Sequence, residues 1–354
     1  MAKVRENIQK LSHYKPPLGG RASEGYLLLD FNERTTEPSL KVKEALRKFI
    51  DSGKLQAYPE YENLEEKIAE YAGVLSGEAI ATNGADQGID LVFRAYVDRG
   101  DKVIIPFPSF PMEYQLAALQ GADILKPLYG KEDSSFPLQE ILDLIDEEVK
   151  LIVIVNPNNP TGTPVLISDI EKILKKAKEK GAVLLHDEAY FEFSGLTCKD
   201  LIKEYDNLYI VRTFSKSFGF PSLRGGYALS QKENIQELLK IRGPYDVNMA
   251  AKVAILAALE DTRYMEDYAK EVMEVSKPKL EEFLKEKNVF FFQSQANFLL
   301  LRVPNPREII EGLKGRGILV RPKNTPEGKE AVRISIGTLE DTNQLIKSLT
   351  EILS

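Results

Sequence analysis

The chain has 354 residues, of which 43% are apolar, and a formal net charge of −7. This length is enough for a large buried core and about two domains, and the apolar fraction excludes a mostly disordered chain. The acidic balance argues against a general nucleic-acid-binding surface, which needs a basic face, so we expect no nucleic-acid partner.

The first residues carry charges at Lys3, Arg5 and Glu6, where a secretion signal would have an apolar segment. The apolar runs are of strand length, well short of the ~20 residues of a membrane-spanning helix. A single cysteine, Cys198, excludes an intrachain disulfide and fits a reducing compartment. We interpret Cys198 as inert because it lacks a basic partner, and we expect a soluble, cytoplasmic protein without a membrane partner.

Strand-like and helix-like segments alternate along most of the chain. Strands are predicted near 101–105, 151–155, 182–186 and 208–213, and helices near 85–97, 167–180 and 233–241. This alternation is typical of an α/β fold with a mostly parallel central sheet. Beyond Pro244, charged helices from about 249 to 287 precede strands near 289–292, 297–303 and 331–336, which indicates a smaller α+β domain.

Two turns in the first half carry candidate binding groups. A glycine-bearing turn in the segment 82–90 opens an amphipathic helix, so the backbone N–H groups of Ala85 and Asp86 can cradle an anion. The proline-rich turn at 106–111 contains Phe110, which can stack on a planar ring. Each feature also has an ordinary explanation: a capped helix in the first case and a core aromatic in the second.

Polar residues follow two of the predicted buried strands. Asn159 lies in the turn after 151–155, and Asp187 and Tyr190 follow 182–186. Parallel strands that are covered on both faces bind ligands at their carboxyl ends, so these side chains should meet in one crevice. Taken alone, Asp187 could equally cap a helix, and the Asn159 segment could be a plain turn.

Lys216 stands among the hydroxyls of Thr213 and Ser215, and Arg224 follows it in the same segment. An amine that binds a carbonyl group beside an anion site is what pyridoxal phosphate (PLP) requires. The alternative is a surface loop with ordinary basic residues.

PLP would also give the other polar residues a role. Asp187 would pair with the protonated pyridine nitrogen, and Asn159 and Tyr190 would reach the ring oxygen. The joint occurrence of Asn159, Asp187 and Lys216 in this order favours the cofactor over the separate ordinary explanations.

With these segments, the chain resembles the fold-type I PLP-dependent aminotransferases, and within them the histidinol-phosphate aminotransferase group. The resemblance covers nearly the whole chain and is carried by NPNNPTG at 156–162, DEAY at 187–190, TFSKSFG at 213–219, LRGGY at 223–227 and VRISIGT at 332–338. It implies a large PLP-binding domain over 30–248, a small domain over 1–29 and 249–354, and a homodimer.

Carried over position by position, the resemblance assigns the cofactor contacts. Lys216 would form the Schiff base and move the proton between substrate and cofactor, with Asp187 and Tyr190 as the other catalytic residues. The implied cofactor-binding residues are Tyr58, Ala85, Asp86, Phe110, Asn159, Asp187, Tyr190, Thr213, Ser215, Lys216 and Arg224. Tyr58 would reach the cofactor of the neighbouring subunit, the Asn159–Pro160 bond is expected to be cis, and no metal is implied.

The implied reaction is transamination between histidinol phosphate and 2-oxoglutarate. Arg333 would clamp the substrate α-carboxylate, a task that suits the fork of a guanidinium. Arg321 would bind the substrate phosphate, with Tyr14 and Asn32 nearby. Without the resemblance, Arg321 could equally be a surface charge at the end of a strand.

Three places near the substrate side chain depart from the group's pattern. Arg34 and Thr35 replace an asparagine-proline pair, Glu113 replaces an aromatic residue, and Asp246 replaces an asparagine. A negative Glu113 near a phosphorylated substrate would be unfavourable unless it points away or pairs with a base. Alternatives therefore stay open: an aromatic or broad-specificity aminotransferase, a threonine-phosphate decarboxylase, or a PLP-binding regulator without turnover.

Overall fold

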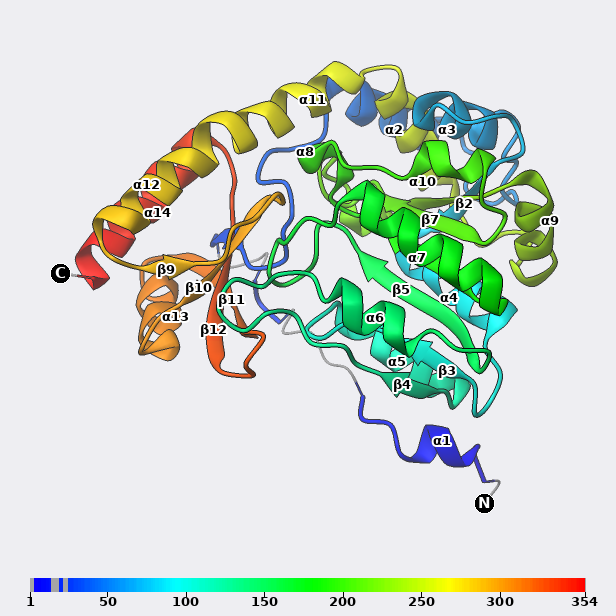
Figure 1. The fold of residues 1–354 in the computed structure, drawn as a ribbon. Helices are drawn as coiled ribbons and strands as arrows, with labels where there is room; N and C mark the ends of the chain where they lie inside the picture. Colours follow the sequence, from blue (N-terminus) through cyan, green and yellow to red (C-terminus); the bar gives the residue numbers. More distant parts are fainter. Residues whose placement is uncertain (1–2, 14–18, 22–24, 354) are drawn as a thin grey trace.

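The computed structural model describes residues 3–13, 19–21 and 25–353 and is built around two β-sheets (Figure 1). The larger sheet has seven strands and the smaller has five. This arrangement confirms the expected α/β fold with a largely parallel central sheet and a smaller α+β part.

The seven-stranded sheet has the order β2-β8-β7-β6-β5-β3-β4. Its strands are β2 (Ala79–Asn83), β3 (Lys102–Ile104), β4 (Asp123–Leu125), β5 (Val149–Val155), β6 (Val183–Asp187), β7 (Leu208–Thr213) and β8 (Gly225–Leu229). Strands β3 to β7 run parallel, and β8 is antiparallel to both β2 and β7.

The sequence prediction found β3, β5, β6 and β7 but not β2, β4 and β8. Strand β8 begins with two glycines, which weaken a strand signal. The structure explains one of them: a Cβ atom on Gly226 would lie 2.4 Å from the backbone carbon of Gly84. The close approach of β8 to the first residue of α4 (Gly84–Tyr96) therefore requires glycine.

Both faces of this sheet are buried. Along β5, Leu151 and Val153 pack on one face and Ile152 and Ile154 on the other, as strand alternation requires. The first face is covered by α4 (Gly84–Tyr96), α5 (Pro111–Gln120) and α9 (Lys232–Ile241). The second is covered by α2 (Leu40–Asp51), α3 (Leu64–Ala72), α6 (Leu138–Leu144), α7 (Ile167–Lys180) and α10 (Met249–Leu259). The strand ends are then the accessible place for a ligand.

The five-stranded sheet joins segments from both ends of the chain. In spatial order its strands are β1 (Leu27–Leu29), β11 (Ile318–Asn324), β12 (Glu330–Ser335), β10 (Phe298–Arg302) and β9 (Phe290–Phe291). Strand β1 pairs in parallel with β11, and the other pairs are antiparallel. Helices α11 (Thr262–Lys270), α12 (Lys277–Glu286), α13 (Pro306–Lys314) and α14 (Leu339–Ile352) pack on it.

The linking segments complete the fold. Figure 1 shows α11 and α12, joined by the π-helical segment η3 (Glu271–Ser276), forming one long path along the outside of the molecule. Short helices are α1 (Glu6–Gln9), α8 (Phe191–Ser194), η1 (Lys199–Lys203) and η2 (Pro221–Leu223). Among the described helices, none combines the length and apolar character needed to cross a membrane.

The packing of helix α10 indicates where the boundary between the two predicted domains lies. Ala251, Ala254 and Ile255 of α10 are buried in the core beneath the seven-stranded sheet, although the expected boundary assigns the chain from 249 onward to the small domain. We therefore propose that the small domain begins after α10, because this helix buries its apolar residues with the large domain.

Candidate active site

A cavity of about 690 Å³ lies between the carboxyl ends of the parallel strands and the five-stranded sheet. The sequence-predicted residues that line it are Asn32, Ala85, Asp86, Phe110, Asn159, Asp187, Tyr190, Thr213, Ser215, Lys216, Arg224, Arg321 and Arg333. Tyr14 lies outside the described residues. Tyr58 is not part of the lining: it is 75% exposed, and its ring stacks on Tyr245 with the centroids 4.4 Å apart.

Strand alternation explains why groups distant in sequence meet here. Val155, Asp187 and Thr213 lie at the carboxyl ends of the adjacent strands β5, β6 and β7. Each shares its strand parity with residues packed under α4, so all three side chains point to the α4 face. The N-terminus of α4, with Ala85 and Asp86, lines the same cavity.

Asp187 is a buried carboxylate at the base of the cavity, only 3% exposed. Its Oδ1 accepts a hydrogen bond from the Ala189 backbone N–H at 2.9 Å. Burial raises the pKa of Asp187 to about 7; the Ala189 hydrogen bond opposes this, and the charge of Asp86 adds to it. A cation placed against Asp187 would lower that pKa again, so the site suits a ligand with a protonated ring nitrogen.

Lys216 reaches the cavity from the loop after β7. Its Nζ donates a hydrogen bond to the Phe31 carbonyl at 2.8 Å. Burial, followed by the positive charge of Arg333, lowers the pKa of Lys216 to about 8. A substantial neutral fraction near pH 8 makes this amine a competent nucleophile for a carbonyl group.

A chain of hydrogen bonds connects Tyr190, which is predicted to contact the ring oxygen, with Arg333, which is predicted to bind the substrate. The Tyr190 hydroxyl accepts from Asn32 Nδ2 at 2.9 Å and from Asn159 Nδ2 at 3.2 Å. Asn159 Oδ1 in turn accepts from Arg333 Nη1 at 2.7 Å. The Asn159–Pro160 bond is cis, as expected from the sequence.

Asn32 lines the cavity and contacts Tyr190. Its Nδ2 donates the hydrogen bond to Tyr190, and its Oδ1 accepts one from Ser335 Oγ at 3.1 Å. The side chain is fully buried. These contacts support a role in positioning Tyr190, and the expected contact with the substrate stays a prediction.

The N-terminus of α4 forms an anion cradle with nearby side chains. Arg224 Nη2 pairs with Asp86 Oδ2 at 2.6 Å. Ser215 Oγ is buried and has no hydrogen-bond partner among the described residues. An orphaned hydroxyl beside a helix N-terminus and an arginine fits the phosphate group of PLP.

Strands β11 and β12 present three cations to the cavity: Arg321, Lys323 and Arg333. Arg321 lies directly opposite Arg333 in the antiparallel register, and Lys323 is two residues further along the same face of β11. The Arg321 guanidinium lies over the Phe31 ring, 4.6 Å from its centroid, so it is not a surface charge at a strand end. Sequence reasoning missed Lys323 because β11 was not predicted; the i, i+2 spacing from Arg321 was the available signal.

Glu113 neither points into solvent nor pairs with a base. It is fully buried, and its Oε2 accepts a hydrogen bond from Ser109 Oγ at 2.7 Å. Its Oε1 has no hydrogen-bond partner among the described residues. Burial and then the charge of Asp187 raise the pKa of Glu113 well above its ordinary value. A raised pKa favours the neutral carboxyl group, and a neutral Glu113 would not repel a phosphorylated substrate as expected from the sequence.

Replacing Glu113 with glutamine should stabilise the protein increasingly as pH rises. The folded state holds the Glu113 proton, whereas the unfolded carboxyl ionises above about pH 4.3. Each pH unit above that value disfavours the wild-type folded state by up to about 1.4 kcal/mol, and glutamine lacks this effect. Thermal unfolding of the holoenzyme at pH 5.5 and pH 8 measures the difference, with the exposed Glu282→Gln variant as control. An equal difference at both pH values would contradict a neutral Glu113.

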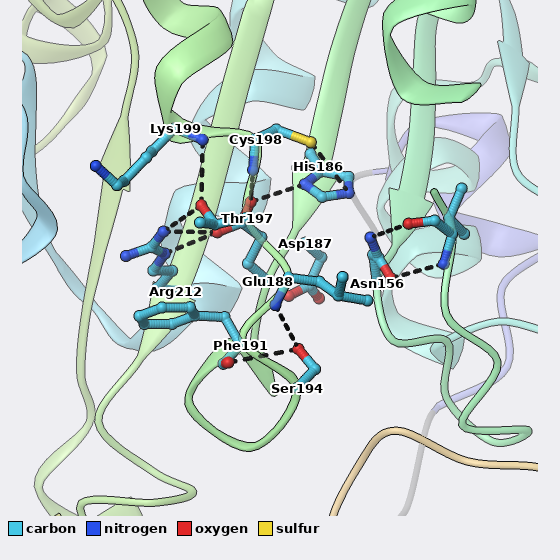
Figure 2. A network of polar contacts seen from close by, with 12 residues as sticks. Asn156, His186, Asp187, Glu188, Phe191, Ser194, Thr197, Cys198, Lys199 and Arg212 are labelled. Carbon is cyan, nitrogen blue, oxygen red and sulfur yellow. Dashed lines mark hydrogen bonds and ion pairs between the residues drawn. The ribbon is translucent and has the colours of Figure 1, made fainter. Parts of the chain in front are cut away.

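A second polar network lies on the opposite face of β6 from Asp187 (Figure 2). His186 Nδ1 is 3.1 Å from Glu188 Oε1, and Arg212 Nε donates to Glu188 Oε2 at 2.8 Å. His186 Nε2 is 4.0 Å from Cys198 Sγ. The expectation that Cys198 lacks a basic partner is therefore wrong, because alternation along β6 turns His186 away from Asp187 and toward Cys198.

This network contains residue types that can bind a metal ion, but the oxygens of its carboxylate are already engaged by other groups. Ligand atoms of His186, Glu188 and Cys198 lie within 4.8 Å of one another. Both Glu188 oxygens are already engaged, however, by Arg212 and by the Cys198 N–H at 2.7 Å. Although burial opposes it, the Arg212 charge lowers the pKa of Glu188 to about 2. We interpret the network as a buried ion pair that holds the turn carrying Asp187.

Comparison with known proteins agrees with this geometry. Residues 24–349 match the family described as aminotransferase class I and II. The chain is 33% identical to the histidinol-phosphate aminotransferase of Thermoanaerobacter sp. (strain X514), over 99% of this chain and 98% of that protein. It is 35% identical to the protein of the same name from Staphylococcus carnosus, over 98% of both.

Solved structures show the same fold. The crystal structure of histidinol-phosphate aminotransferase from Sinorhizobium meliloti in complex with pyridoxal-5'-phosphate superimposes with a TM-score of 0.87. The superposition covers 100% of this chain and 98% of that one, at 23% sequence identity.

Proposed function

Because this chain belongs to the aminotransferase class I and II family, we propose that it transfers an amino group from histidinol phosphate to 2-oxoglutarate. The enzyme is a PLP-dependent transaminase. The names of its full-length relatives support the substrate and a place in histidine biosynthesis. When bound, PLP supplies a carbonyl carbon that links to amines and a ring that accepts electrons.

The observation that carries this proposal is the pairing of a reactive amine with a buried carboxylate in one cavity. Lys216, whose pKa is lowered to about 8, and Asp187 both line it. Lys216 would bind the cofactor carbon and move the proton of the substrate carbon. Asp187 would hold the proton on the ring nitrogen, and Tyr190 with Asn159 would fix the ring oxygen.

The cofactor phosphate and ring have their own candidate partners. The cradle at Ala85 and Asp86, with Ser215 and Arg224, would hold the phosphate, and Thr213 lines the cavity beside them. Phe110 at the start of α5 would stack on the ring.

The chemistry of histidinol phosphate refines the role expected for Arg333. This substrate is an amino alcohol ester and has no α-carboxylate; a phosphorylated CH₂O group occupies that position. The phosphate would therefore lie where the α-carboxylate of glutamate lies, near Arg333. Arg321 opposite Arg333 is close enough in the strand register to share it.

A panel of substrates tests the proposal. Holoenzyme is mixed separately with histidinol phosphate, phenylalanine, tyrosine, glutamate and threonine phosphate, and the absorbance of the bound cofactor is followed through a single turnover. Histidinol phosphate and glutamate should react fastest. Faster reaction of phenylalanine and tyrosine would favour a broad-specificity enzyme, and release of carbon dioxide from threonine phosphate would favour a decarboxylase.

We also propose that the enzyme works as a homodimer in the cytoplasm. The exposed Tyr58–Tyr245 aromatic pair supports the first part, because Tyr58 is available to a second chain. The single buried Cys198 fits a reducing compartment.

A further inference from the structure

The cations on β11 and β12 exceed what a carboxylate substrate needs. Arg333 is engaged with Asn159 Oδ1 and with the Asp30 carbonyl, each at 2.7 Å. Arg321 Nη1 is buried and, within the described part of the chain, has no hydrogen-bond partner. Lys323 is half-buried in the same lining.

No nearby carboxylate neutralises Lys323 within the described residues. Burial and then the charges of Arg333 and Arg321 lower the pKa of Lys323 to about 7. Three acidic residues line the cavity: Glu33 is bound by Arg21, Asp86 is bound by Arg224, and Asp187 is not among the charges that shift the pKa of Lys323. A lysine held beside two arginines without a counter-ion is an anion site, since an anion would relieve the repulsion among the three cations.

The spacing suits an anion larger than a carboxylate. Two residues on one face of a strand lie about 7 Å apart, so Arg321 and Lys323 can approach a tetrahedral group from two sides while Arg333 contacts it from the neighbouring strand. A phosphate ester has three terminal oxygens and a charge near −2, whereas a carboxylate has two oxygens and one charge.

We propose that Lys323 completes a three-cation subsite with Arg321 and Arg333 and makes the enzyme prefer a phosphate dianion over a carboxylate. The identity of the phosphorylated substrate rests on the proposed function. The role of Lys323 as a specificity-determining residue rests on its position in the cavity and on the lack of a counter-ion for it among the residues that the structure describes.

A matched pair of substrates tests this role. Histidinol phosphate and L-histidine share the imidazole and the amine and differ in the anionic group. In single-turnover kinetics of the holoenzyme, Lys323→Gln should reduce the apparent second-order rate constant for histidinol phosphate by about 10- to 100-fold, the loss of one charged hydrogen bond. The loss for L-histidine should be several-fold smaller. Lys323→Arg should restore the preference, and the exposed Lys329→Gln serves as the matched control.

Inhibition by sulfate tests the role of Lys323 without depending on the identity of the phosphorylated substrate. Sulfate is a dianion that does not titrate between pH 6 and 9, and in the holoenzyme the cofactor itself fills the cofactor phosphate cradle. At pH 6.5, sulfate should inhibit the glutamate reaction of the wild type about tenfold more strongly than that of Lys323→Gln, at matched ionic strength. As pH rises through 7 to 9, wild-type inhibition should weaken as Lys323 loses its proton, while Lys323→Arg stays inhibited. The charged groups that shift the pKa of Lys323 are Arg333 and Arg321, and both are retained in all variants.

The outcomes separate the two proposals. If wild-type enzyme does not react with histidinol phosphate, the proposed substrate is wrong, and the sulfate arm still decides the role of Lys323. If histidinol phosphate and L-histidine lose rate equally in Lys323→Gln, or if sulfate inhibition is unchanged, the subsite proposal is overturned.

Discussion

Lys216→Ala is expected to lower the transamination rate by more than about 10³-fold while the protein stays folded. No other lysine among the described residues lines the end of the cavity formed by β5, β6 and β7, so the variant loses both the covalent link to the cofactor and the group that moves the proton. Borohydride reduction of the wild-type holoenzyme, followed by peptide mapping, should place the label on Lys216. The exposed Lys203→Ala variant is the control, and a label on another lysine would refute the assignment.

Mixed dimers extend this experiment to the proposed assembly. If Tyr58 completes the neighbouring subunit's site, a dimer of one Lys216→Ala chain and one Tyr58→Phe chain has one doubly defective site and one intact site. Mixing and exchanging the two variants should then raise the activity above that of either variant alone. No gain after exchange would place Tyr58 outside the site.

Asp187→Ala should reduce turnover by at least about 100-fold, the scale on which a preorganised charge stabilises a transition state. The carboxylate would hold the proton on the ring nitrogen, and without it the ring is a weaker electron acceptor. The cofactor should still bind, because its phosphate cradle and Lys216 remain. The rate is measured in single turnover with glutamate, and cofactor occupancy by absorbance.

The control for Asp187 is Asp200→Ala, which removes an exposed carboxylate on η1. Near-normal turnover in Asp187→Ala would mean that its carboxylate acts only in the turn, through the hydrogen bond from Ala189.

Several features of the site followed from the sequence because they depend on local patterns. Apolar runs predicted β5, β6 and β7, and in parallel strands the residues after such runs share one edge of the sheet. Asp187 and Asn159 could therefore be placed together from the sequence alone. The lysine segment and the glycine turn before α4 are likewise local, since each depends on a few consecutive residues.

Other features were decided only by contacts between distant segments. Asn32 forms a hydrogen bond with Tyr190, 158 residues away in sequence, and Arg333 forms one with Asn159, 174 residues away. Strand β1 is three residues long and finds its partner β11 near the other end of the chain. No periodicity in a short segment indicates such a partner.

The charge states also needed the fold. The pKa of Glu113 is raised because helix α5 buries it near Asp187, and Lys323 lies near Arg333 because β11 pairs with β12. Burial and the charges brought near by packing set these pKa values, and neither is encoded in the residues next to them in sequence. The sequence by itself thus determined the fold class and the cofactor chemistry, through motifs and strand alternation. The tertiary structure decided which charged and polar groups meet in the site, because this depends on long-range packing.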